Sequence, residues 1–177
     1  MSDTDSEAPA GGGELEAYRL GRTYAMLPIA MVPEACRHVP AGPVTFVVEG
    51  RRLTDEAILG SAVAQGATDV VEGPTGVDDG GMTVHVLGAA DRLEHLRFDC
   101  FDQQPHYHYI DNVTGSNTVV RIDTHAEGDP TAWSLARLRE RLPEMLAHAG
   151  VPDLAEQVRA APAAVARGID QVERLLG

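Results

Sequence analysis

Polar and apolar residues alternate along four consecutive segments between residues 82 and 123. Because alternate side chains of a β-strand share one face, this alternation predicts strands with one apolar and one polar side. The segments cover residues 82–87, 93–101, 106–110 and 118–123. Turn-forming residues separate them, so we expect an antiparallel β-meander of four or more strands, either flat or curled into a half-barrel.

The two predicted faces differ in chemistry. The apolar face requires a core and carries Val84, Val86, Leu96, Phe98, Cys100, Tyr107, Tyr109, Val120 and Ile122. The polar face carries His85, His95, Arg97, Asp99, His106, His108, Arg121 and Asp123. Apolar residues such as Phe101 and Val119 share this second side, and a fully solvated face would not need them. We therefore expect a partly covered pocket there, with a plain solvent face as the alternative.

Loop lengths predict which of these polar residues are neighbours. An even-length loop at residues 102–105 sets Asp99 opposite His108, and a short loop around residues 89–91 sets His85 opposite His95. The next turn sets His108 opposite Arg121, and likewise His106 opposite Asp123. The predicted row across the strands is Asp99, His108, Arg121.

Helical patterns flank the predicted sheet. Asp129 followed by Pro130 is a helix start, and apolar residues then recur with helical spacing as far as Gly150, although Pro143 should kink this helix. We expect a short helix at residues 154–158 and a last one from Pro162. Before the meander we expect a buried strand at residues 44–48, a turn at 49–52 and a helix capped by Thr54 or Asp55.

These elements predict one α+β domain, in which C-terminal helices at about residues 130–177 cover the apolar face of the sheet. The domain would span residues 14–177. Residues 1–13 are acidic and glycine-rich, and we expect them to be a disordered tail. Residues 66–81 are rich in glycine and acidic residues and predict a long loop, either continuous or interrupted by a strand at residues 69–72.

Composition excludes several functions. The net charge of −13 disfavours binding to nucleic acid and to anionic membrane surfaces. The chain contains no lysine, which excludes a pyridoxal-phosphate enzyme, a Schiff-base mechanism and a phosphate-binding loop of the P-loop type. It also lacks a Gly-x-Gly-x-x-Gly after a strand, so we expect no nucleotide cofactor. Without a secretory or membrane-spanning segment, we expect a cytoplasmic protein.

A metal site is the first hypothesis for the polar face. His106 and His108 lie two residues apart in one strand, so both imidazoles share one side. Asp99 or Asp123 would complete a set of two histidines and one carboxylate, with His95 or His85 as a replacement ligand. Such a set binds Zn²⁺ or Fe²⁺ and leaves positions open for water and substrate.

Two other hypotheses compete with a metal enzyme. With Zn²⁺ in the metal site, Arg97 and Arg121 would hold an anionic group of a small substrate. In a metal-free acid–base enzyme, His108 would be the base, Asp99 would orient it, and Arg121 would hold a carboxylate or phosphate. In a non-enzymatic protein, the same face would be a binding surface, for example between the two copies of a homodimer. The sequence leaves the choice among the three open.

Overall fold

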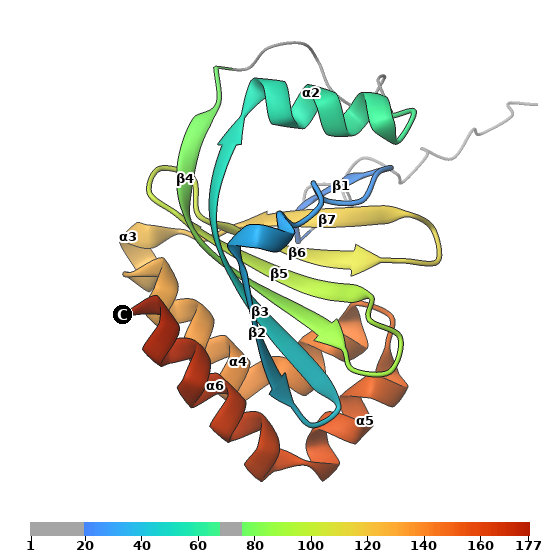
Figure 1. Ribbon diagram of the computed structural model, residues 1–177, viewed down its shortest axis with the longest axis vertical. Coiled ribbons are helices and arrows are strands. Elements are labelled where there is room, and N and C mark those ends of the chain that lie inside the picture. Colours follow the sequence, from blue (N-terminus) through green and yellow to red (C-terminus); the bar gives the residue numbers. More distant parts are fainter. Residues whose placement is uncertain (1–19, 68–75) are drawn as a thin grey trace, which may run out of the picture.

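The structure is a computed structural model that describes residues 20–67 and 76–177 (Figure 1). Its strands are β1 (Arg22–Tyr24), β2 (Cys36–Ala41), β3 (Val44–Thr54), β4 (Asp78–Gly88), β5 (Glu94–Phe101), β6 (His106–Asp111) and β7 (Ser116–Arg121). Its helices are η1 (Pro33–Ala35), α2 (Asp55–Ala64), α3 (Thr124–Glu127), α4 (Pro130–His148), α5 (Pro152–Ala160) and α6 (Pro162–Leu176).

The strands form one seven-stranded antiparallel sheet in the order β1-β7-β6-β5-β4-β3-β2. Strands β4 to β7 are the predicted meander. Strands β2 and β3 extend it on one side, and the short β1 crosses over to pair with β7 on the other. The sheet is therefore open, with β1 and β2 at its two edges. The predicted α+β class, an antiparallel meander with C-terminal helices, is confirmed.

The apolar face of the sheet packs against the C-terminal helices, as predicted. Figure 1 shows α4, α5 and α6 gathered on one side of the strands. Phe98 and Tyr107 stack with ring centroids 6.0 Å apart, and Trp133 of α4 lies 5.3 Å from the Tyr107 ring. Each large apolar side chain buried here contributes about 1.5–3 kcal/mol to stability. Cys100 is also buried, beside Ser134 of α4.

Local sequence explains where the helices begin. The Thr54 hydroxyl accepts a hydrogen bond from the Ala57 amide and caps α2, and the Asp129 carboxylate does the same for α4 through the Ala132 amide. Proline occupies the first turn of α4, α5 and α6, where its missing N–H has no helical acceptor. The predicted helices after residue 130 are thus confirmed. Among the helices within the described ranges, none is long and apolar enough to cross a membrane.

The polar face is covered by two pieces of the same chain. Helix α2 lies over it, and so does the segment of residues 25–32 between β1 and η1, which we call the covering segment (Figure 1). Met26 packs on Ala62 and Ala67 in a small second cluster. The Gln65 side chain donates to the Leu27 carbonyl at 3.0 Å and accepts from the Leu27 amide at 2.8 Å. These contacts join the covering segment to the end of α2.

Two local predictions are wrong, and two others lie outside the described residues. Strand β3 continues through the predicted turn at residues 49–52 as far as Thr54, because β4 pairs with its whole length. Residues 78–81 belong to β4 rather than to a loop for the same reason. The predicted tail at residues 1–13 and the alternative strand at residues 69–72 lie outside the described residues.

The predicted strand registers are displaced by two residues, which keeps Asp99, His106, His108 and Arg121 on their predicted face. Asp99 lies opposite His106 rather than His108, because the 102–105 turn is tighter than expected. Its Gln103 and Gln104 amides donate to the Asp79 carboxylate of β4, which holds the turn against the sheet.

The pairings of β6 with β7 and of β4 with β5 are also displaced by two residues from their predicted registers. His106, and not His108, lies opposite Arg121, because β7 pairs two residues earlier along the chain. His85 lies opposite Arg97 and not His95, because the pairing of β4 with β5 is irregular at Val86 and Leu87.

Candidate metal centre

The strand registers arrange the polar side chains in two rows across the sheet. The first row runs Arg121, His106, Asp99, Thr83, Glu49 from β7 to β3. The second row runs Arg22, Val119, His108, Arg97, His85 from β1 to β4. Directly opposite residues in neighbouring strands have Cβ atoms about 4.5–5.5 Å apart. The two rows therefore concentrate ionisable groups in the centre of the face.

A pocket of about 570 Å³ lies over these rows. Its floor is the polar face, and its cover is the covering segment with α2. This volume falls within the range of about 300–1,000 Å³ that is typical of small-molecule sites. The polar face is therefore a covered pocket rather than a solvent-exposed surface, as the apolar residues on this face predicted.

Three potential metal ligands meet in the pocket. The ligand atoms of Asp99, His106 and His108 all lie within 4.8 Å of one another. Asp99 Oδ2 is 3.0 Å from His108 Nε2 and 3.3 Å from His106 Nε2. A metal ion with bond lengths near 2.0–2.1 Å holds neighbouring ligand atoms about 3.0–3.4 Å apart. The two measured distances thus match neighbouring positions around one ion.

Each of the three residues has a second polar atom that is held by the protein. The Thr83 hydroxyl donates to Asp99 Oδ1 at 2.5 Å, which leaves Oδ2 to face the histidines. His108 Nδ1 is 2.8 Å from Asn117 Oδ1, and His106 Nδ1 is 2.7 Å from the Gln104 carbonyl. Such partners on the far side of a ligand fix its orientation in metal sites.

The Asn117 amide determines the tautomer of His108. Its Nδ2 donates to the Met26 carbonyl at 2.6 Å, so its Oδ1 must accept from the imidazole. The ring proton of neutral His108 is therefore on Nδ1, and its Nε2 carries a lone pair. The Gln104 carbonyl imposes the same tautomer on His106. Both lone pairs point towards the Asp99 carboxylate oxygen.

Burial and hydrogen bonding shift the pKa values of the triad. Burial alone would raise the pKa of the Asp99 carboxyl, but His106 and His108 hold that pKa well below its ordinary value. Burial lowers the pKa of the His108 imidazole, despite the neighbouring carboxylate. Burial also acts to lower the pKa of His106, but its contact with Asp99 outweighs this effect and raises it. At neutral pH, Asp99 is thus ionised and His108 is neutral.

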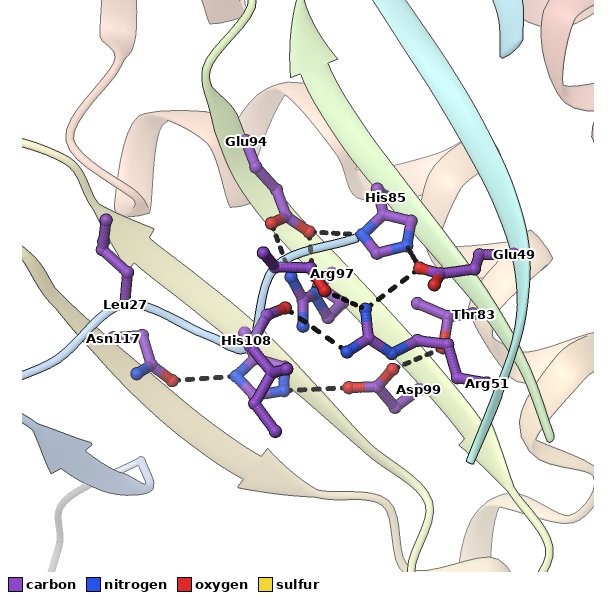
Figure 2. A network of polar contacts seen from close by, with 12 residues as sticks. Leu27, Glu49, Arg51, Thr83, His85, Glu94, Arg97, Asp99, His108 and Asn117 are labelled. Atoms are coloured by element: carbon purple, nitrogen blue, oxygen red, sulfur yellow. Dashed lines mark hydrogen bonds and ion pairs between the residues drawn. The ribbon is translucent and has the colours of Figure 1, made fainter. Parts of the chain in front are cut away.

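A second buried network adjoins the triad (Figure 2). His85 lies between two carboxylates, 3.0 Å from Glu49 and 2.6 Å from Glu94. Arg97 binds Glu94 with two hydrogen bonds of 2.7 and 2.8 Å, and Arg51 binds Glu49 at 3.0 Å. Each carboxylate therefore has its own guanidinium. These pairs compensate the buried charges, and they support the floor of the pocket.

The structure separates the predicted site residues into two groups. It brings together Asp99, His106 and His108, and it places Arg97 and Arg121 on the same pocket. His95 is directed away from the triad by the irregularity in β5, and its Nε2 lies 3.1 Å from Asp91. Asp123 follows the end of β7 and caps α3 instead. Neither His95 nor Asp123 belongs to the triad.

Sequence reasoning missed several partners of the triad. Asn117 lies one residue before the predicted strand at residues 118–123, but it belongs to β7 and has the same strand parity as Val119 and Arg121. Extending the predicted strand by one residue would have found it. Glu49 falls in the predicted turn at residues 49–52, whereas in the structure it is part of β3 and its side chain is on the polar face. The contribution of the covering segment, through the Met26 carbonyl, has no local sequence pattern because it depends on contacts between distant parts of the chain.

No curated protein and no solved structure matches the chain significantly. One family model, described as "Domain of unknown function (DUF7700)", matches residues 38–176. The matched part contains the meander, the triad and the three C-terminal helices. It does not include β1 or the covering segment. The chain therefore belongs to the DUF7700 family of domains of unknown function.

Proposed function

We propose that this protein is a metal-dependent enzyme that acts on a small anionic substrate, with a zinc or iron ion bound by Asp99, His106 and His108. One observation carries the proposal. The three ligand atoms lie within 4.8 Å of one another, and the remaining polar atom of each residue is already engaged by Thr83, Asn117 or the Gln104 carbonyl.

Electrostatics support a cation at this point. Neutral His108 presents the lone pair of Nε2 to the ionised Asp99 carboxylate, an arrangement that is repulsive unless a proton or a metal ion lies between them. The contact with Asp99 also raises the pKa of His106, so the carboxylate favours a positive charge at this point. The Asn117 and Gln104 partners already fix the ring protons on the opposite nitrogens. A divalent cation would satisfy all three ligand atoms at once.

The number of ligands supports catalysis over a purely structural ion. Structural zinc sites have four protein ligands, whereas catalytic sites have three and keep an open position. The described residues offer three ligands here, within a pocket that has room for a substrate. A bound ion would act as a Lewis acid and lower the pKa of a coordinated water, or, if iron, open oxygen chemistry. The protein supplies ligand orientation and a partly dry pocket.

Metal-free acid–base catalysis is the second candidate. The 3.0 Å contact between Asp99 Oδ2 and His108 Nε2 favours it, since a proton can be shared between a carboxylate and an imidazole nitrogen at that distance. Use of this face for dimer formation has less support. Glu49, His85 and Arg97 are all buried within their own chain, so they offer no open surface to a second copy.

The test is elemental analysis of protein purified without chelators or a polyhistidine tag. We expect about one equivalent of zinc or iron per chain, and its loss in His106→Ala and His108→Ala. His38→Ala is the matched control, because His38 is exposed on β2, outside the pocket. Thr83→Val and Asn117→Ala should keep the fold and weaken metal binding about 10- to 100-fold, since they remove only the orienting partners.

A metal-free protein that binds Zn²⁺, Fe²⁺, Mn²⁺ and Ni²⁺ no tighter than millimolar would refute the metal site. The acid–base mechanism would then be tested with His108→Ala, which should abolish turnover while circular dichroism shows a retained fold. Metal that persists in both His106→Ala and His108→Ala would place the ion elsewhere in the chain.

A further inference from the structure

We propose that the pocket binds a monocarboxylic acid with an apolar body, whose carboxylate lies between Arg22 and Arg121. The inference rests on the proposed function for the position of the reacting centre, while the binding step itself requires no metal. It gives the anion-binding role to Arg22 and Arg121 in place of Arg97. It also adds an apolar requirement to the substrate.

Four arginines line the pocket, and two of them are neutralised. Arg51 is bound to Glu49 and Arg97 to Glu94. Within the described chain, neither Arg22 nor Arg121 forms an ion pair with a carboxylate, and the guanidinium of Arg22 lies 4.9 Å from the Tyr24 ring centroid. Among the described residues, the pocket therefore has two guanidinium groups without a carboxylate partner.

Arg22 and Arg121 differ from other unpaired arginines in their position. Five other exposed arginines in the described part of the chain form no ion pair either, but none of them lines this pocket: Arg37, Arg92, Arg141, Arg167 and Arg174. Arg22 and Arg121 instead line a cavity of about 570 Å³ in a protein with a net charge of −13. Two guanidinium groups on one cavity, with no described carboxylate as a partner, favour an anionic ligand there.

The sheet places the two free guanidinium groups as a pair. Arg22 on β1 lies opposite Val119, and Arg121 is two residues further along β7 on the same face. Diagonal neighbours of this kind have Cβ atoms about 7–8 Å apart or less. Long side chains at that separation can both reach one carboxylate, whose two oxygens match the fork of donors on a guanidinium.

The geometry of the donors favours a carboxylate over a phosphate monoester. A planar carboxylate presents two oxygens that match the fork of a guanidinium, whereas a phosphate monoester has a third oxygen that needs a further donor. Arg22 and Arg121 are the two arginines of the pocket lining that have no described carboxylate as a partner. A carboxylate thus fits this pair.

The cover of the pocket is apolar. Residues from the covering segment, β3 and α2 face the cavity, together with one residue before β4: Leu27, Ile29, Leu53, Ile58, Leu59 and Val77. Burying a hydrocarbon chain against such a surface is favourable in proportion to its area. With its carboxylate at Arg121, the acid would bring the carbons next to the carboxylate towards the triad, because His106 is the direct neighbour of Arg121.

The test measures binding of hexanoate by titration calorimetry at pH 7, with hexanamide, hexyl phosphate, butanoate and octanoate as comparisons. We expect hexanoate to bind at least ten-fold more tightly than hexanamide, because the amide lacks the charge. Affinity should rise about three- to four-fold per added methylene group. Tighter binding of hexyl phosphate, or equal binding of acid and amide, would overturn the proposal.

Variants locate the binding residues. Arg22→Gln and Arg121→Gln should each weaken hexanoate binding about ten-fold or more, and Arg121→Lys should restore only part of the loss because lysine lacks the planar fork. Arg141→Gln, on an exposed position of α4, is the matched control. Unchanged affinity in both pocket variants, with the fold intact by circular dichroism, would refute the assignment.

The same titration separates this inference from the proposed function. Selective hexanoate binding by a protein that holds no metal would support the arginine pair and refute the metal enzyme. A metal-loaded protein that does not distinguish hexanoate from hexanamide would support the metal site and refute the arginine pair.

Discussion

Glu94 shows at the scale of a single residue how the buried charges of the sheet are balanced. Burial alone would raise the pKa of its carboxyl, but Arg97, and with it His85, lowers that pKa to about 2. A carboxyl with a depressed pKa stabilises the folded state fully above its unfolded pKa near 4.3, and this contribution is lost as the pH falls towards 2. The shift corresponds to about 3 kcal/mol.

Glu94→Gln is therefore expected to act in two ways. At pH 7 it should lower the free energy of unfolding by about 3–5 kcal/mol, because Arg97 remains buried without its partner. Between pH 4.5 and about 2 it should make stability less dependent on pH, because the titrating group is gone. Urea unfolding at a series of pH values measures both effects. Glu127→Gln, at an exposed position on α3, is the control. An unchanged slope below pH 4.5 would contradict the role of Glu94.

The face on which each site residue lies was predictable, because the alternation of side chains between the two faces of a strand can be read from the local sequence. Alternation placed His106, His108 and Asp99 on one face, and the displaced registers kept them there since each shift was by two residues. Their neighbours were less predictable. The Asp79 carboxylate tightens the 102–105 turn from another strand, and the irregularity opposite Val86 turns His95 away. Neither effect can be inferred from local alternation.

Helix α4 contains a proline in its interior, where proline disfavours a helix. It runs for 19 residues through an internal proline, Pro143, while its buried residues hold the apolar face of the sheet. A proline inside a helix cannot donate to the carbonyl four residues earlier, here that of Arg139, and its ring crowds that carbonyl. The helix thus forms because its apolar face is buried and not because each residue favours it.

Pro143→Ala should stabilise the protein by about 1–3 kcal/mol, because it restores a helical hydrogen bond and removes the clash. A gain of that size raises the melting temperature by about 2–4 °C per kcal/mol in a chain of this length. Thermal unfolding followed by circular dichroism measures it. Pro152→Ala is the matched control, since Pro152 lies in the first turn of α5, where no hydrogen bond is lost. Equal gains from both variants would show that the interior position has no special cost.

Element types were also more predictable than the way elements cover one another. The Thr54 cap specified the start of α2 between β3 and β4, and the Asp129 cap and the prolines at helix starts specified the helices after the sheet. The position of α2 over the polar face depends on its contacts with Met26 and Leu27, which belong to a different part of the chain. The pocket arises from that arrangement. Alternation in the strands therefore predicted its floor in outline but could not predict its cover.

At the scale of the whole molecule, the sheet divides two tasks between its faces. The side under α4 and α6 holds the large apolar core, in which Phe46, Leu96 and Phe98 are fully buried. The other side holds the ionisable groups and the pocket. Stability is therefore expected to come mainly from the first side and ligand binding from the second. The protein without metal should be folded, unlike small domains that need an ion to fold.

Metal binding should nevertheless raise the melting temperature, since a ligand that binds only the folded state stabilises it by RT ln(1 + [L]/Kd). At a free Zn²⁺ concentration one hundred times the Kd, the gain is about 2.7 kcal/mol, or roughly 5–11 °C. Calorimetric scans with Zn²⁺, and with a chelator instead, measure the difference. Asp99→Asn should abolish the increase, whereas His38→Ala should retain it, because only Asp99 belongs to the triad. If the chelator unfolded the protein completely, the apolar core between the sheet and the helices would not be enough to keep the protein folded without metal. If Asp99→Asn kept the full increase, zinc would be stabilising the fold from a different site.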